Sequence, residues 1–158
     1  MIDSIRILLD PGDCFSIPLE DGTFAFGQYL LSHPKVGTLI RVFDLRSSTR
    51  DVAVDDLKRS KLLFAPIFVG LNPPVRSGRW KKVGAFPIED DFEFPRFRAS
   101  LLLRDTENTD WKIWDGRSYT QLGRLTPEFK HLELKCVYAY GDVERRILTG
   151  RDWIADMR

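Results

Sequence analysis

Short runs in which apolar residues alternate with other residues constrain this chain more than any other feature. In the clearest run, 14–19, large apolar side chains occupy every second position. A period of two places those side chains on one face of a β-strand. Alternating or β-branched and aromatic runs, separated by turn-forming residues, follow at 24–30, 38–45, 62–71, 80–88, 96–104, 111–123 and 133–141. The sequence therefore predicts about seven to nine strands.

The first two runs are separated by an Asp-Gly turn, a pair typical of β-hairpins. With an even-numbered loop, Phe24 and Phe26 of the second strand would share the face of Phe15. Ile17 belongs to that face too, so we expect a half-buried hairpin with one apolar side. Pro18 cannot donate a hydrogen bond to the ladder, and this favours a loop slightly longer than two residues.

Convincing helical periodicity is confined to the C-terminal region. Val143 and Ile147 form an i, i+4 stripe that Leu148 extends, and Gly150 is placed to end the helix. A second, shorter helix could be capped by Asp55 or Asp56.

The segment 72–78 is expected to be a loop, and helices do not alternate with strands as a parallel βαβ fold would require. The predicted fold is mainly β (α+β). It is a single domain over residues 1–158, built as an antiparallel twisted sheet or open barrel with one or two short helices, including a C-terminal one.

Composition narrows the class of protein. The chain has 158 residues, 43% of them hydrophobic and 30% charged, which is ordinary for one globular domain. Its formal net charge is +1, whereas nucleic-acid-binding proteins usually carry a clear basic excess. No apolar run approaches the roughly 18 residues of a membrane helix, and the N-terminus does not resemble a signal peptide. We expect a cytoplasmic protein with no membrane partner.

Sequence motifs for catalysis are missing. The chain contains no G-x-S-x-G, no phosphate-binding G-x-x-x-x-G-K-[ST] and no G-x-G-x-x-G. Cys14 and Cys136 are not in C-x-x-C spacing, and we expect both to be free thiols. His33 and His131 lie far apart in the sequence and suggest neither a metal site nor a cofactor. A non-enzyme is the expectation.

One catalytic alternative is a metal-dependent nuclease. Glu133 and Lys135 form an E-x-K pair that follows Asp110 and Asp115. In such enzymes two carboxylates hold Mg²⁺, and the lysine steadies the attacking water or the phosphate. The spacing is loose, however, and the pair would also be explained by two solvated side chains on one face of a strand. The second interpretation is favoured.

A small β-rich nucleic-acid-binding module is the main alternative function. Segments 78–82 and 95–98 mix basic residues with Trp80 and Phe97, and such mixtures can stack on bases and follow phosphates. The competing explanation is that alternate strand residues face solvent and are charged for that reason.

The most unusual local feature is the segment 89–94, which we call the acidic loop. It carries four carboxylates within five positions, interleaved with two aromatic residues. Its residues are Glu89, Asp90, Asp91, Phe92, Glu93 and Phe94. A solvated loop tolerates such a run. The functional interpretation is a partner-binding loop, in which charge speeds encounter with a basic protein and a buried aromatic supplies affinity.

Several stretches, taken in order, resemble the immunity protein 26 family of bacterial polymorphic-toxin systems. They are "GDCFSIPLEDGTFAFGQYL", "LLFAPIFVG", "GRWKKVGAFPI" and "WKIWDG", and the resemblance spans about residues 11–148. It implies a mostly β protein that binds and neutralises a cognate toxin in the cytoplasm, with no catalysis and no cofactor. Surfaces that contact toxins vary within such families, so the resemblance assigns no contact residues. The partner expected from the acidic loop is a cognate toxin, such as a basic nuclease.

Overall fold

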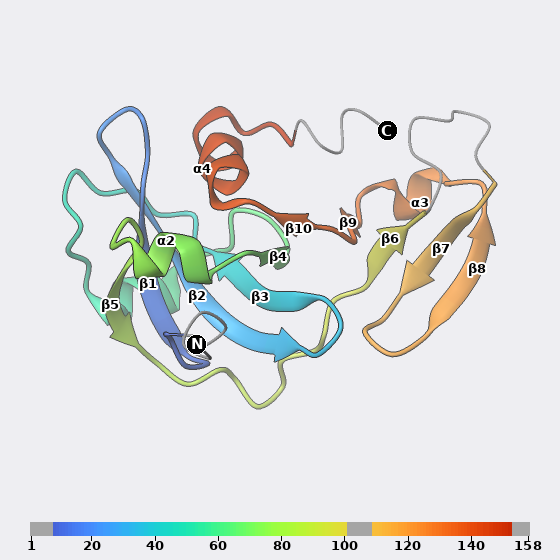
Figure 1. Ribbon diagram of the computed structural model, residues 1–158, viewed down its shortest axis with the longest axis horizontal. Coiled ribbons are helices and arrows are strands. Elements are labelled where there is room, and N and C mark those ends of the chain that lie inside the picture. The colour runs from blue at the N-terminus through green and yellow to red at the C-terminus, as the bar shows by residue number, and fades with distance from the viewer. Residues whose placement is uncertain (1–7, 101–108, 153–158) are drawn as a thin grey trace.

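The computed structural model describes residues 8–100 and 109–152, which form two β-sheets and four short helices (Figure 1). The first sheet has the strand order β10-β4-β3-β2-β1-β5, and the second has the order β8-β7-β6-β9. The strands of the first sheet are β1 (Asp13–Pro18), β2 (Phe24–His33), β3 (Gly37–Val42), β4 (Ile67–Val69), β5 (Lys81–Ala85) and β10 (Val137–Tyr138). Those of the second are β6 (Phe97–Ala99), β7 (Trp111–Trp114), β8 (Tyr119–Gly123) and β9 (Glu133–Leu134). The helices are α1 (Val54–Arg59), α2 (Asn72–Arg76), α3 (Pro127–Lys130) and α4 (Tyr140–Thr149).

The mainly β, α+β prediction is confirmed, and the sheets are open rather than closed into a barrel. Neighbouring strands are antiparallel except for two pairs, β10 with β4 and β9 with β6. Both exceptions come from the segment 133–141, which was expected to be one strand. It divides into two very short strands, one in each sheet, and so ties the sheets together near the C-terminus.

The loop of the first hairpin has an odd number of residues. The prediction of which side chains share a face of this hairpin is therefore wrong. The Leu19 amide donates to the Thr23 carbonyl at 2.9 Å, so residues 20–22 form the loop. Gly22 completes it with φ 86°, a left-handed conformation that glycine adopts without strain. Three-residue hairpin loops commonly end in such a residue.

Compared with a two-residue loop, a three-residue loop moves every side chain of the second strand to the opposite face of the sheet. Ile17 therefore lies opposite Ala25. Phe26 shares a face with Cys14 and not, as expected, with Phe15. The strands of this hairpin are also buried on both faces rather than on one.

Burial on both faces follows from how the helices are placed. On one face, Phe15 stacks on Trp80 with ring centroids 5.3 Å apart, and α4 covers them with Val143 and Ile147. On the other face, Leu57 of α1 packs with the cluster around Phe26 and Phe86. Burying an indole such as that of Trp80 contributes about 5 kcal/mol before entropy costs are counted.

A third apolar cluster lies where the two sheets meet. It contains Leu30, Leu39 and Phe68 from the first sheet, together with Phe97 and Trp114 from the second. The Phe68 ring lies 5.3 Å from that of Phe97 and 5.9 Å from that of Trp114, measured between centroids. This cluster, which we call the junction cluster, positions the acidic loop.

The helices differ in how well the sequence predicted them. The C-terminal helix α4 is confirmed, with Gly150 ending it at φ 72°. The segment expected to be a loop contains α2, because prolines fit the first turn of a helix. Helix α1 exists, but its N-cap residue is Ala53, and the two aspartates lie in its first turn.

Within the described residues, no helix has the length and apolar character needed to cross a membrane. The strand predicted at 96–104 begins as β6, and its part beyond Ser100 lies outside the described residues, as does most of the turn at 105–110.

Candidate functional site

The acidic loop connects β5 of the first sheet to β6 of the second. It contains no helix or strand, and a hydrogen bond from the Phe92 amide to the Glu89 carbonyl, 3.1 Å long, closes a turn within it. The side chains of Asp90, Asp91 and Glu93 are exposed. None of these three carboxylates forms an ion pair with another described residue.

Glu89 differs from the other acidic residues of the loop because Arg41 holds it. The two guanidinium NH2 groups donate to its carboxylate oxygens at 2.6 Å and 3.0 Å. These hydrogen bonds from Arg41 lower the pKa of Glu89. Paired in this way, Glu89 fixes the beginning of the loop and contributes little free negative charge to the surface.

Arg41 is itself part of a buried hydrogen-bonded network. Its Nε donates to the Gln28 side-chain oxygen at 2.8 Å. The Gln28 amide nitrogen donates in turn to the carbonyls of Gly12 and Phe86, at 3.0 Å and 2.8 Å. Because every member of the network has a partner, burying Gln28 and Arg41 leaves no polar group unsatisfied.

The two aromatic residues of the loop face inward. Phe92 and Phe94 are partly buried and pack on the junction cluster. The Phe94 ring meets Trp114 edge to face at 5.6 Å, and it also lies against Gly116, where an added Cβ would be 2.8 Å from the ring. This packing gives both rings a structural role. That one of them also adds affinity for a partner stays a prediction.

A groove of about 730 Å³ opens beside Glu89. Phe43, Phe86 and Arg41 line it, and Lys58 and Leu62 lie along it as exposed side chains. Leu62, which is 40% exposed, adds apolar surface to the groove. The combination of apolar and charged groups is suited to contact with another molecule.

Ser60 supplies a hydroxyl to the wall of this groove, and that hydroxyl donates to the Asp56 carbonyl of α1 at 2.7 Å rather than to a base. The nearest thiol, that of Cys14, packs with Phe43 and Phe86, and burial raises its pKa to about 11. A thiol with such a pKa stays protonated near neutral pH and is a poor nucleophile. Cys14 and Cys136 are not joined in a disulfide, and Cys136 is only partly buried, whereas Cys14 is buried.

The E-x-K pair does not form a metal site with the preceding aspartates. Arg146 of α4 binds both carboxylate oxygens of Glu133, at 2.6 Å and 2.8 Å. Lys135 points elsewhere, with its ammonium group 4.5 Å from the centroid of the Trp114 ring. Asp110 binds Lys112 at 2.8 Å.

Asp115 is used within the β7–β8 turn, where it accepts hydrogen bonds from the Arg117 and Ser118 amides. These hydrogen bonds lower the pKa of Asp115. His33 is equally occupied, since its Nε2 donates to the Gly116 carbonyl and its Nδ1 accepts from the Lys35 amide. Among the described residues, no three His, Cys, Asp or Glu side chains are grouped so as to hold a metal ion.

The aromatic residues on which nucleic-acid binding would depend are buried. Trp80 and Phe97 are both 0% exposed, so neither ring can stack on a base without leaving the core. Arg79 forms a two-point contact with Glu144, and the Trp80 indole nitrogen donates to the same carboxylate. These groups stabilise the attachment of α4 to the first sheet.

Sequence reasoning missed the residues that hold the acidic loop, namely Arg41 and Gln28. A signal for them exists in the sequence. Each is a polar residue inside an otherwise apolar strand, and a buried polar side chain needs a partner. The pattern shows that a partner is required but does not show that the partner is Glu89, because 48 residues separate Arg41 from it.

The fold is mainly β, and it presents an exposed acidic loop that Arg41 holds at one end and the packing of Phe94 holds at the other. The sequence profile of the immunity protein 26 family matches residues 10–108, which is more than half of the chain. The chain belongs to the immunity protein 26 family, and membership supports an immunity role with a cognate toxin as partner. The resemblance seen in the sequence extended further, to about residue 148. Comparison with curated proteins gave no match, and comparison with solved structures gave none.

Proposed function

We propose that this protein binds one cognate toxin in the bacterial cytoplasm and neutralises it by forming a stoichiometric complex, without catalysis of its own. Family membership supports this proposal. The site supports it too, because the acidic loop and its groove offer charge and apolar surface that suit contact with another protein. A toxin whose own substrate is anionic, such as a nuclease, would present the basic surface that this loop fits.

The observation that carries the proposal is the way the acidic loop is held. Glu89 is bound to Arg41 at one end of the loop, and Phe94 is packed on Trp114 at the other. Between these two points, Asp90 and Asp91 are exposed and make no ion pair with a described residue. A binding loop that is already ordered loses less conformational entropy when it binds.

The test begins with the toxin-like product of the adjacent gene, copurified and titrated with this protein. We expect a one-to-one complex in which the toxin is inactive. The double variant Asp90→Lys/Asp91→Lys should slow association at low salt by about tenfold or more, because charges at the rim of an interface act mainly on the association rate. Raising the salt concentration should shrink the difference.

A matched control is Asp51→Lys/Asp55→Lys, which changes the net charge equally at exposed positions outside the loop. It should associate at a rate close to that of the wild type. If both double variants slow association equally, net charge and not the acidic loop is responsible. If the wild type forms no complex with the toxin, the inhibitory function itself is wrong.

A further inference from the structure

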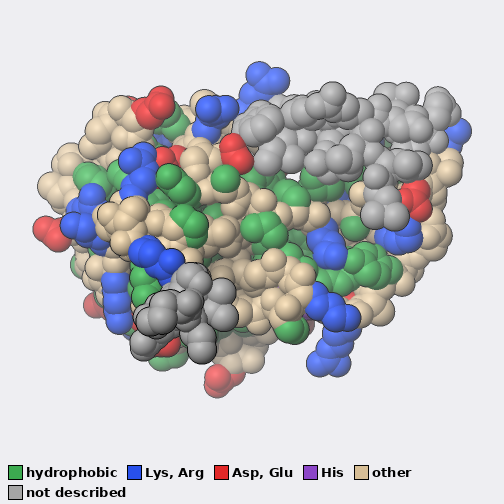
Figure 2. All heavy atoms as spheres, in the orientation of Figure 1, with side chains coloured by type: hydrophobic (Ala, Val, Ile, Leu, Met, Phe, Trp, Pro, Cys, Tyr) green, Lys and Arg blue, Asp and Glu red, His purple; other side chains and the backbone are tan. Residues whose placement is uncertain are grey.

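The second sheet carries a surface of opposite charge. Two hollows, of about 450 Å³ and 370 Å³, lie side by side there and share Tyr119 and Lys135 in their walls. Figure 2 shows Lys and Arg side chains around an apolar area over the right-hand part of the molecule, where Figure 1 places the second sheet. We call the two hollows together the basic surface.

The walls of the basic surface contain cations and no carboxylates among the described residues. Lys112 lies in one hollow, and Lys35 and Arg117 lie in the other. Lys112 is paired with Asp110, which is not part of either wall. Lys35, Arg117 and Lys135 have no ion pair with a described residue, so the surface keeps a positive potential.

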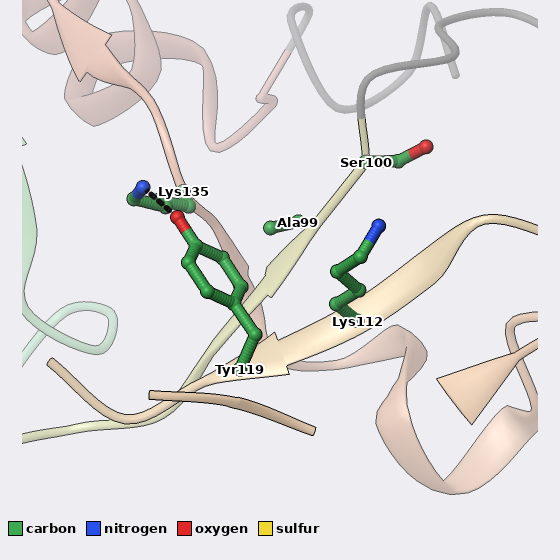
Figure 3. A pocket seen from close by; sticks show the side chains of 5 residues that line it. All are labelled: Ala99, Ser100, Lys112, Tyr119 and Lys135. Atoms are coloured by element: carbon green, nitrogen blue, oxygen red, sulfur yellow. Dashed lines mark hydrogen bonds between the residues drawn. The ribbon is translucent and has the colours of Figure 1, made fainter. Parts of the chain in front are cut away.

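Lys135 is held in place by aromatic rings and not by an acid. Its ammonium group donates a hydrogen bond to the Tyr119 hydroxyl (Figure 3). The same group lies 4.5 Å from the Trp114 ring centroid and 5.0 Å from that of Tyr119. Such contacts orient a cation without neutralising it. Lys135 is therefore a positioned positive charge, beside a tyrosine that is 50% exposed.

We infer that the basic surface is a docking site for acidic side chains of a protein partner. The inference rests on the proposed function and names the cognate toxin as that partner. Carboxylates of the toxin would meet Lys135, Lys35 and Arg117, and the exposed Tyr119 would supply apolar contact. Tyrosine and arginine, here Tyr119 and Arg117, are among the residue types enriched in protein interfaces.

The structure favours a protein partner over a nucleic acid. Nucleic-acid binding would need a track of cations along successive phosphates and several accessible rings for stacking. Here Tyr119 is exposed, but Trp114 is only 3% exposed. The acidic loop lies close by, since Phe94 packs on Gly116 of the same turn that carries Arg117, and it interrupts any continuous track of cations that successive phosphates could follow.

This proximity also predicts how the toxin is recognised. The His33–Gly116 hydrogen bond and the Phe94 ring fix the β7–β8 turn to the rest of the molecule. Acidic and basic surfaces are thus joined firmly, and a matching toxin needs a basic and an acidic patch at the corresponding separation. A pair of opposite charges rejects wrong partners better than a single charge does. Half of the residues that line the basic surface, including Arg117, Tyr119 and Lys135, lie beyond residue 108, outside the matched range, and so can serve recognition particular to this chain.

The decisive experiment is an NMR titration of the whole protein with a short oligoglutamate peptide and, separately, with a short oligouridylate of equal charge. We expect the peptide to shift the resonances of Tyr119 and Lys135. The variant Lys135→Glu should weaken peptide binding by about tenfold. Because Lys135 packs on Trp114, the variant Lys35→Glu/Arg117→Glu, which alters exposed side chains only, provides a second measurement with the same expectation.

The control variant is Lys81→Glu/Arg145→Glu, which reverses two exposed charges on β5 and α4 and should bind the peptide as the wild type does. In the toxin complex, the basic-surface variants should lower affinity while this control does not. The inference is overturned if the peptide leaves Tyr119 and Lys135 unmoved, or if the oligouridylate binds there more tightly. A wild type that binds the peptide at this surface but not the toxin would sink the proposed function alone.

Discussion

Arg41 is the residue on which the position of the acidic loop most depends. The variant Arg41→Ala would leave the buried Gln28 oxygen without its donor and Glu89 without its counter-ion. Breaking a fully buried pair costs several kcal/mol, but Glu89 is 44% exposed and water can replace part of the contact. We expect a loss of about 2 kcal/mol in the free energy of unfolding, measured by urea denaturation.

The matched control for this substitution is Arg59→Ala. Arg59 pairs with Asp56 on the surface of α1, and its side chain is 75% exposed. We expect it to cost less than about 0.5 kcal/mol. Equal losses in the two variants would show that the buried network contributes nothing beyond a surface ion pair.

Protonation of the Glu89 carboxylate should make the stability of the folded protein depend on pH. Hydrogen bonds from Arg41 lower its pKa from 4.5, so the folded state favours the ionised carboxylate. Because the pKa of Glu89 is lower in the folded state, its carboxylate contributes its full stabilisation at pH values above the pKa that it has in the unfolded chain. This stabilisation is lost as the pH falls through the pKa of the folded state. Melting temperature should therefore fall on acidification below about pH 4.5, and less steeply in Glu89→Gln than in the wild type. Parallel pH profiles for the two proteins would contradict this account.

At the scale of elements, the β7–β8 turn is the place to test how the acidic loop is fixed to the second sheet. Gly116 has φ 98°, and an added Cβ would lie 2.8 Å from the Phe94 ring. The variant Gly116→Ala should lose about 3 kcal/mol, from left-handed strain and from displacement of the ring. Gly22 has φ 86° with nothing near its missing Cβ, so Gly22→Ala should lose only about 1 kcal/mol. Urea denaturation of both variants measures the difference in the free energy of unfolding. Equal losses would show that the Phe94 ring can move aside at little cost.

The first hairpin shows how far the sequence can predict the fold. Alternation identified both strands and the turn between them, because those signals are local. The facing of Phe26 could not be derived, because it depends on whether the loop has two residues or three, and "LEDGT" is compatible with both. A single backbone conformation, at Gly22, decides which aromatic residues meet the helices on each side.

The acidic loop shows the corresponding limit for the candidate site. Its composition marked it as unusual, and the structure places Asp90, Asp91 and Glu93 on the surface. The inward direction of Phe92 and Phe94 and the pairing of Glu89 come from distant residues that the local sequence does not contain. The basic surface was missed for the same reason, since Lys35 and Lys135 are 100 positions apart in the numbering and meet only in the fold.

At the scale of the whole molecule, several contacts between described residues join the two sheets, in addition to the segment that carries β9 and β10. The junction cluster packs Phe68 of the first sheet against Phe97 and Trp114 of the second. The acidic loop adds Phe94 to that cluster. The Glu133–Arg146 ion pair ties β9 to α4, which covers the first sheet. The apolar contacts among these bury side chains of the two sheets against one another. Unfolding one sheet alone would expose the apolar side chains of the other sheet, and it is therefore unfavourable.

These connections lead us to predict that the chain unfolds as one cooperative domain, as its length suggested. In a urea titration followed by NMR, the amide signals of Tyr29 in β2 and Ile113 in β7 should disappear at the same midpoint. The variant Phe94→Ala, which weakens the junction cluster, should separate the two midpoints, with Ile113 lost first because its sheet has four strands rather than six and its strand β8 is largely exposed. An earlier loss of Ile113 in the wild type would mean that the second sheet is an independent unit. The acidic and basic surfaces would then not be rigidly joined, and a toxin could be bound by either one alone.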